Sequence, residues 1–297
     1  MNIFLESSGS LVSASIIKSI QSAGFRAIAS DISYESVGRY LSDEFVLSPK
    51  KNDPMLWDKF KKIMIEYKVH AVFPSFDPTL HGWSCRKDEF MDSNTCIILS
   101  DASTVQLFQD KYQAYKFFLK EGIRTPETSL EKDFSLVKPR VGSGAKGVIF
   151  NASKDICMEG MLSQEYIKGE EYTVDVFCNQ EGEPVYILPR LRLGIVDGKS
   201  TSGIIIKDEV IQKEVNRICQ IVKFRGPVNF QCIKSKDGKV SFLEVNPRLS
   251  GGMILSFSAS ENWINLAIKH FVFGDKINPK QVKYGLGMHR YYSEIFF

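Results

Sequence analysis

The sequence predicts a protein of mixed α/β and α+β class, in which an N-terminal parallel βαβ domain is followed by α+β structure. Over the first hundred residues, short apolar strands alternate with helical segments, which is typical of a parallel sheet. After Thr125-Pro126 the chain changes to strands, hairpins and glycine loops. We therefore expect one domain over residues 1–100 and a second over residues 101–297.

The composition indicates a globular protein of the cytoplasm. The chain has 297 residues, of which 43% are hydrophobic and 25% charged, and a length that suits two domains. The net charge is only +3 and the basic residues are dispersed, so we expect no nucleic-acid partner. None of the six cysteines forms a CxxC pair, which favours reduced thiols. We find no signal-peptide pattern and no bilayer-length apolar run, and expect no membrane partner.

The first domain is expected to contain four strands and two helices. The loops at the carboxyl ends of such strands, residues 7–10 and 74–78, should line a ligand crevice. A dinucleotide site with Asp31 on the ribose is an alternative, but the first loop has one glycine where that fingerprint needs three. The expected strands are residues 3–5, 26–30, 71–73 and 97–99, and the expected helices are residues 11–23 and 55–67.

A helix over residues 103–120 should open the second domain. Its apolar positions repeat at helical spacing, and Gly122 follows its end. We interpret these side chains as core, not as a cofactor box. They are Val105, Phe108, Tyr112, Tyr115 and Leu119.

A glycine-rich loop follows the strand that carries Lys138. Three glycines, Gly142, Gly144 and Gly147, precede a short return strand at residues 148–149. Such a loop can bring backbone N–H groups close to phosphates, although it is not a Walker A loop because no helix with GK[ST] follows. An ordinary flexible hairpin is the equal alternative.

The most informative segment is a hairpin over residues 228–248. The turn signal Asp237-Gly238 predicts a register in which Gln231 lies opposite Glu244 and Asn229 opposite Asn246. These four side chains share one face, and they offer the oxygen ligands that magnesium prefers when phosphates complete its shell. The other face is predicted core: Val228, Phe230, Cys232, Leu243 and Val245. An amphipathic hairpin with its polar side in water is the alternative.

Two further segments complete the pattern. Residues 165–167 form an extended connector whose backbone can pair with an adenine edge, and Glu171 can accept ribose hydroxyl protons. A solvated acidic turn is the alternative for this stretch. Arg248 follows the hairpin directly and can hold a γ-phosphoryl group.

In this order and spacing, the segments resemble the ATP-grasp superfamily, most closely the short proteins similar to half of the carbamoyl-phosphate synthetase large subunit. The motifs are Asp110-Lys111, Lys138 with its glycine loop, residues 164–176, and residues 244–248. The resemblance implies two α+β subdomains that clamp the nucleotide: a lid at about residues 115–168 and a C-terminal subdomain at about residues 169–297. The N-terminal domain would lie on the substrate side.

The resemblance also implies roles for individual residues. Lys111 and Lys138 would contact the α- and β-phosphates, and the loop of Gly142, Ser143, Gly144 and Gly147 would close over the triphosphate. Adenine would be read by Gln164 and the connector Glu165, Tyr166 and Ile167, and ribose by Glu171. Gln231, Glu244 and Asn246 would bind Mg²⁺ or Mn²⁺. Arg248, and with it Arg190 and Arg192, would face the transferred phosphoryl group or the substrate carboxylate.

The implied function is an ATP- and Mg²⁺-dependent carboxylate–amine ligase acting on small molecules through an acylphosphate, with a homodimer as a common assembly. A small-molecule kinase that stops at the phosphorylated product is one alternative, and a non-catalytic ATP-binding module is another. The chain has one ATP-grasp unit and no amidotransferase segment, so we do not expect the full synthesis of carbamoyl phosphate.

Overall fold

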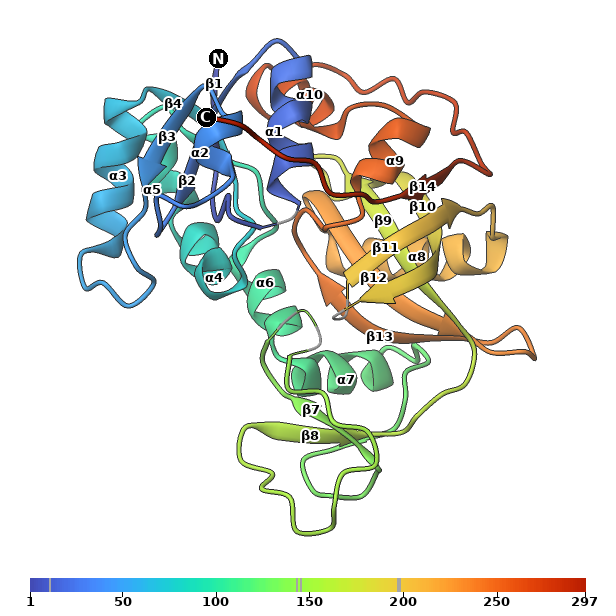
Figure 1. Cartoon of the computed structure of the whole chain (residues 1–297). Helices are drawn as coiled ribbons and strands as arrows, with labels where there is room; N and C mark the ends of the chain where they lie inside the picture. The colour runs from blue at the N-terminus through green and yellow to red at the C-terminus, as the bar shows by residue number, and fades with distance from the viewer. Residues whose placement is uncertain (11, 143, 145, 197–198) are drawn as a thin grey trace.

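The computed structural model describes residues 1–10, 12–142, 144, 146–196 and 199–297. Three sheets organise the described chain: a five-stranded parallel sheet, a three-stranded sheet and a six-stranded antiparallel sheet. In Figure 1 the parallel sheet and the six-stranded sheet lie side by side, and the small sheet extends below them. The predicted fold class is confirmed.

The N-terminal sheet has the strand order β3-β2-β1-β4-β5, with all neighbours parallel. The chain order reverses between β1 and β4, which is where ligands bind in open α/β sheets. Ile16, Ile17 and Ile20 of α1 are buried as predicted. The elements are β1 Asn2–Leu5, α1 Ser13–Ser22, β2 Arg26–Asp31, α2 Gly38–Leu41, β3 Glu44–Leu47, α3 Leu56–Glu66, β4 Val69–Phe73, α4 Asp77–Cys85, α5 Lys87–Met91 and β5 Cys96–Ile97.

The single helix predicted at residues 103–120 is two helices, α6 Ala102–Gln109 and α7 Lys111–Lys120. Asp110 separates them with an extended backbone (φ −101°, ψ 107°), and its carboxylate accepts hydrogen bonds from the backbone N–H groups of α7. The break changes the helical phase, so Leu119, predicted to be core, is 51% exposed. It also makes Lys111 the first residue of α7.

The three-stranded sheet, which we call the lid, has the order β6-β8-β7. Its strands are β6 Thr128–Ser129, β7 Leu136–Pro139 and β8 Met161–Gln164. The return strand predicted at residues 148–149 is reduced to one bridge between Val137 and Ile149, on the edge of β7 opposite to β8. The lid therefore holds Lys138 on a strand whose partner comes from further along the chain.

The six-stranded sheet has the order β13-β12-β9-β10-β11-β14, and α8 covers one face. That face is apolar, with Val174, Phe230 and Val245 packed against Ile211 and Val215 of α8. The elements are β9 Glu170–Cys178, β10 Pro184–Val196, β11 Lys199–Ile205, α8 Glu209–Val222, β12 Gly226–Lys234, β13 Val240–Asn246, α9 Ile254–Ala259, α10 Trp263–Ala267, the π-helix Ile268–Val272 and β14 Gly287–His289.

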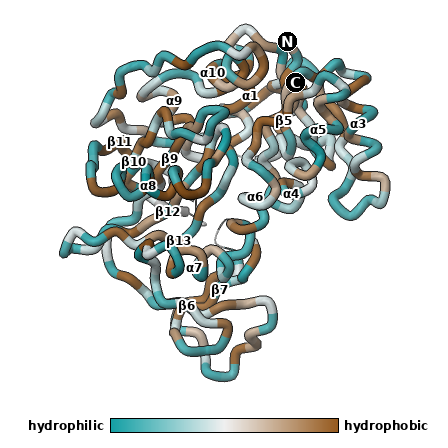
Figure 2. The backbone as a smooth tube through the Cα atoms, turned by 180° about the vertical axis from the view of Figure 1, so that it is seen from behind, coloured by the Kyte–Doolittle hydropathy of each residue, from teal (hydrophilic) through white to brown (hydrophobic). Residues whose placement is uncertain are grey.

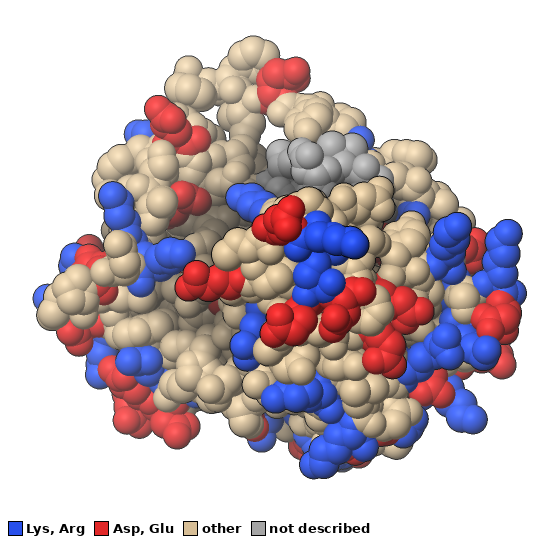
Figure 3. Space-filling model, turned by 90° about the horizontal axis from the view of Figure 1, so that it is seen from below, with Lys and Arg blue, Asp and Glu red and all other residues tan. Residues whose placement is uncertain are grey.

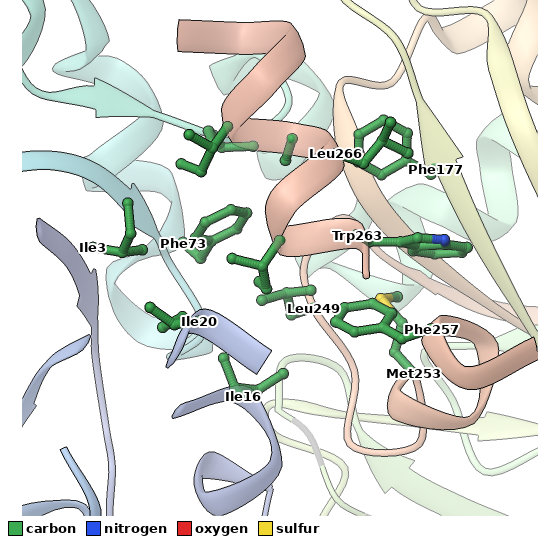
Figure 4. Packing of buried hydrophobic residues seen from close by; sticks show 14 of the residues in the cluster. Ile3, Ile16, Ile20, Phe73, Phe177, Leu249, Met253, Phe257, Trp263 and Leu266 are labelled. Carbon is green, nitrogen blue, oxygen red and sulfur yellow. The ribbon is translucent and has the colours of Figure 1, made fainter. Parts of the chain in front are cut away.

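One apolar cluster joins the two larger sheets. Ile3, Ile16 and Phe73 of the N-terminal domain pack in the same cluster as Phe177 and Trp263 (Figure 4). Hydrophobic stretches run along the strands of the six-stranded sheet, while many outer loops are hydrophilic (Figure 2). The shared core fixes the N-terminal domain against the six-stranded sheet.

The lower face of the molecule carries acidic and basic side chains in mixture (Figure 3). Among the described helices, none combines the length and the apolar character that crossing a bilayer requires. All six cysteines, each within the described part of the chain, are free thiols.

Candidate active site

The hairpin of β12 and β13 sets the candidate metal ligands side by side. Gln231 lies opposite Glu244 and Asn229 opposite Asn246, as predicted. Asn246 Nδ2 donates a hydrogen bond to Glu244 Oε1 at 3.1 Å, so these two side chains share one face. One carboxylate and two amide oxygens are therefore available near each other, a donor set that fits a magnesium ion whose remaining ligands are phosphate oxygens and water.

The route to this register differs from the prediction. Strand β12 ends at Lys234 and β13 begins at Val240, and the register shifts by one residue between Gln231 and Cys232. This bulge leaves Leu243 as the extra residue of β13. Leu243 is half-buried and Phe242 fills the core at 1% exposure, so the prediction of Leu243 as core is wrong.

Lys138 extends from the lid toward the same face. Its Nζ donates to Gln164 Oε1 at 2.7 Å, and Gln164 Nε2 in turn donates to Thr128 Oγ1 at 2.8 Å. Burial lowers the pKa of Lys138 to about 8, the charge of Glu244 opposes that shift, and the charge of Lys111 adds to it. A desolvated ammonium group with a neutral partner is suited to binding an anion.

The pKa of Lys138 predicts a pH dependence of nucleotide binding. As pH rises through about 8 in the free protein, the ammonium group loses its proton and its attraction for phosphate. We expect the affinity for MgATP, measured by calorimetry, to fall about tenfold between pH 7 and pH 9. Lys138→Arg should remove the dependence because arginine stays charged. The exposed control Lys120→Arg should keep it, and equal profiles for all three proteins would contradict the assignment.

The glycine loop is tied to the start of α7. Lys111 Nζ donates to the carbonyl oxygen of Gly142 at 2.6 Å, and the Lys111 backbone N–H donates to the Arg140 carbonyl at 3.0 Å. Arg140 Nε also donates to Asp110 at 2.9 Å, an ion pair that the sequence did not predict. Gly142, Gly144 and Gly147 have φ values of 142°, 69° and 75°, which suit glycine. Ser143, also predicted to contact phosphate, lies outside the described residues.

The predicted adenine connector follows β8 and lies outside the regular secondary structure. The Glu165 backbone N–H donates to the Glu127 carbonyl at 2.8 Å. Tyr166 is 57% exposed, with its ring edge-to-face to Phe150, and Ile167 is half-buried. Its contact with adenine stays a prediction.

Glu171 and Arg192, predicted to contact different parts of the ligand, are partners of each other. Arg192 Nη1 donates to Glu171 Oε1 across the neighbouring strands β10 and β9. The Arg192 side chain is nearly buried and that of Glu171 is partly exposed. A ribose hydroxyl that binds Glu171 would therefore share this carboxylate with the guanidinium group of Arg192.

Arg248 links the hairpin to the N-terminal domain. Its Nε and Nη2 donate to the two carboxylate oxygens of Asp77 at 2.6 and 2.9 Å, the bidentate geometry that fixes a guanidinium group. Its Nη2 is also 3.4 Å from Asn246 Oδ1. Arg248 is thus held beside a candidate metal ligand by the first residue of α4.

Arg190 is buried and paired with Asp175, and its contact with phosphate or substrate stays a prediction. It is 2% exposed, and its Nε donates to Asp175 Oδ2 at 3.1 Å. The chain after Arg248 covers this part of the sheet: a Cβ atom on Gly252 would lie 2.3 Å from Arg190 Nη1. The side chain is therefore packed beneath that loop.

Asp175 is the centre of a buried network that the sequence analysis did not identify. Its carboxylate is fully buried. Besides Arg190, it accepts hydrogen bonds from Asn229 Nδ2 at 3.0 Å, Ser250 Oγ at 3.1 Å and Ser256 Oγ at 2.7 Å. The sequence feature that could have indicated this network is the acidic Asp175 between the apolar residues Val174 and Val176. The network holds the loop after Arg248 against the sheet.

Comparisons with known proteins agree with this architecture. Residues 157–292 match a family model described as ATP-grasp in the biosynthetic pathway with Ter operon, and residues 3–98 match a PylC-like N-terminal domain. No curated protein sequence matches the chain significantly.

Three solved structures illustrate the similarity of fold. The biotin carboxylase domain dimer of Hydrogenobacter thermophilus 2-oxoglutarate carboxylase, in complex with MgADP, ADP and bicarbonate, has a TM-score of 0.73 and 13% identity, covering 96% of this chain and 72% of that chain. An L-amino acid ligase from Bacillus licheniformis has a TM-score of 0.71 and 17% identity, covering 94% and 75%. N5-carboxyaminoimidazole synthetase from Staphylococcus aureus, complexed with ADP, has a TM-score of 0.72 and 15% identity, covering 95% and 79%.

The PylC-like match covers the N-terminal parallel domain, and the ATP-grasp match covers most of the six-stranded domain. This is the predicted order of the two domains along the chain. The narrower resemblance to carbamoyl-phosphate synthetase stays a prediction. Residues 157–292 match an ATP-grasp family, residues 3–98 match a PylC-like N-terminal domain, and the chain has the fold of ATP-grasp proteins.

Proposed function

We propose that this protein is an ATP- and Mg²⁺-dependent carboxylate–amine ligase that acts on small molecules through an acylphosphate. The observation that supports the proposal most strongly is the hairpin register, in which Gln231 of β12 lies opposite Glu244 of β13, with Asn246 two residues further along β13. Arg248 follows β13 directly and lies beside Asn246. Lys138 supplies a desolvated positive charge from the lid. The names of two similar structures, an L-amino acid ligase and N5-carboxyaminoimidazole synthetase, favour ligase chemistry over a non-catalytic role.

In the proposed reaction, an oxygen of the substrate carboxylate attacks the γ-phosphorus of ATP, and ADP leaves. The amine nitrogen then attacks the acyl carbon, phosphate leaves with the electron pair of the C–O bond, and the nitrogen gives its proton to solvent. The protein need supply no nucleophile, because positioning and charge neutralisation provide most of the catalysis in phosphoryl transfer.

Each candidate residue has a role in that scheme. Lys111 and Lys138 would bind the α- and β-phosphates, with the glycine loop above them. Arg248 would neutralise the charge that develops on the transferred group. Gln231, Glu244 and Asn246 would hold the ion, and bound Mg²⁺ supplies electrostatic stabilisation of the phosphate oxygens. Mn²⁺ fits the same oxygen ligands.

The proposal is tested by incubating the protein with MgATP and a panel of small carboxylates, with and without amines. We expect ADP formation that depends on one class of carboxylate, an amide when the matching amine is present, and a hydroxamate when hydroxylamine replaces the amine. A stable phosphorylated product that never becomes an amide would instead support a kinase. Absence of nucleotide binding would contradict both enzymatic readings.

A homodimer is the assembly we propose for the active protein. The Hydrogenobacter thermophilus domain in the similar structure above is a dimer. Light scattering coupled to gel filtration checks this point independently of activity, with a monomer mass as the contradicting result.

A further inference from the structure

A cavity of about 220 Å³ lies at the carboxyl ends of the parallel strands in the N-terminal domain. By the same measure a single water molecule needs roughly 10–15 Å³, so the cavity accommodates a small organic molecule. Phe60, Phe76 and Pro49 provide apolar walls, while Glu6 and Ser48 provide polar atoms. The cavity therefore combines the two kinds of lining that small-molecule sites show.

Two buried oxygen atoms of this lining have no hydrogen-bond partner among the described residues. They are Glu6 Oε2 and Ser48 Oγ. The other oxygen of Glu6 is well bonded, since Oε1 accepts from Thr79 Oγ1 at 2.7 Å and from Trp83 Nε1 at 3.3 Å. Glu6 is only 4% exposed, and an unsatisfied buried polar atom costs free energy comparable to a lost hydrogen bond. A ligand that donates to Oε2 removes this cost.

The charges around the cavity favour a cationic ligand. Glu6 and Asp31 are two carboxyl groups in the lining, against one lysine, Lys51, whose side chain is exposed. Burial raises the pKa of Glu6 to about 7, while the hydrogen bonds from Thr79 and Trp83 oppose the rise. The backbone amides of Phe76 and Ser75 also oppose it, although neither makes a hydrogen bond to Oε2. An ammonium group at Oε2 would favour the ionised carboxylate.

The cavity is connected to the candidate active site through α4. Thr79, which bonds Glu6, is two residues after Asp77, which holds Arg248. The lining also takes in the ends of β1 and β2 and the segments after β3 and β4, which include the point where the strand order reverses. A ligand in the cavity would therefore lie near the residue proposed to neutralise the transferred phosphoryl group.

We propose that this cavity binds the amino group and short apolar body of a primary-amine substrate, with Glu6 Oε2 as the acceptor of the ammonium hydrogen bond. The inference rests on the proposed ligase function, for which it names the class of the amine partner and the place where that partner is held. Glu6 acts here as a binding residue and Ser48 as a second polar contact.

The test measures binding in the full chain without nucleotide. The probes are primary n-alkylammonium ions from methyl to pentyl, with alcohols and carboxylates of equal length. The readouts are calorimetry and the intrinsic tryptophan fluorescence, to which Trp83, a hydrogen-bond donor to Glu6, contributes. We expect saturable binding of amines at pH 8. Glu6→Gln should weaken it about tenfold or more, because the carboxylate charge is lost. The exposed control Glu35→Gln should leave it unchanged.

Two further variants keep the test decisive. Ser48→Leu fills part of the cavity while Glu6 itself is unchanged, and it should also abolish amine binding. In the wild type, amine affinity should fall about tenfold from pH 8 to pH 6 as Glu6 takes up its proton. Glu6→Gln should lose this pH dependence, whereas Asp31→Asn should keep it.

The outcomes separate this inference from the proposed function. No saturable amine binding, equal affinity in Glu6→Gln, or equal binding of carboxylates would overturn the amine site. MgATP binding is measured on the same samples: a protein that binds MgATP but no amine retains the proposed function and loses only this inference. One that binds amines but not MgATP keeps the amine-binding cavity but loses the proposed function, and with it the role of the amine as a substrate.

Discussion

Replacing Asp175 with alanine is expected to lower the free energy of unfolding by about 3–5 kcal/mol. The substitution leaves the guanidinium of Arg190 buried at 2% exposure without its counter-charge, and it removes the acceptor of Ser250, Ser256 and Asn229. Urea denaturation followed by circular dichroism measures the change. The loop after Arg248 should also become more accessible to protease, since its anchor is lost.

Two companion variants show whether the effect comes from the buried charge. The double variant Asp175→Leu/Arg190→Met removes both charges and should be markedly more stable than Asp175→Ala, because an apolar pair often replaces a buried ion pair without loss. Glu209→Ala, whose side chain is 81% exposed, should stay within about 0.5 kcal/mol of the wild type. A cost under about 1 kcal/mol for Asp175→Ala would show that the network is not structural.

Glu244→Gln is expected to lower the rate of ATP-dependent turnover on the order of 100-fold or more, with little change in stability. Glu244 supplies the only carboxylate among the three proposed metal ligands. Glutamine keeps the shape and can still accept the hydrogen bond from Asn246 Nδ2. The loss should therefore be of charge alone, and it should raise the Mg²⁺ concentration required for half-maximal activity.

The Glu244 substitution has a second, measurable consequence at Lys138. Because the charge of Glu244 raises the pKa of Lys138, its removal should move the pH profile of nucleotide binding to lower pH. Glu209→Gln provides a matched control on an exposed helix surface. Unchanged Mg²⁺ dependence in Glu244→Gln would place the ion elsewhere.

The strands of the site could be predicted from the sequence because strand alternation is a local property. The pairs Gln231–Glu244 and Asn229–Asn246 follow from this alternation. Near the turn, however, the observed register differs from the prediction by one residue, and the bulge at Leu243 restores the predicted register for these two pairs. Bulges depend on packing against neighbouring strands, which the local sequence does not specify. The sequence around Leu243 therefore did not indicate that Phe242 occupies the core in its place.

Other features depend on contacts distant in sequence and could not be predicted. Glu6 meets Thr79 and Trp83, which are 73 and 77 residues away, so its burial follows only from the folded domain. Arg190 alternates correctly with Arg192 on its strand, yet the loop containing Gly252 covers it. The break at Asp110 was more accessible, since an aspartate two and three residues before Tyr112 and Gln113 is a typical N-cap.

The most direct measurement is a crystal structure of the protein with Mg²⁺ and a non-hydrolysable ATP analogue. We expect the triphosphate between the lid strand of Lys138 and the hairpin of β12 and β13, with the ion within about 2.0–2.1 Å of oxygen atoms from Glu244 and Asn246. Nucleotide bound at the loop of residues 7–10, or an ion that contacts neither side chain, would contradict the proposed site.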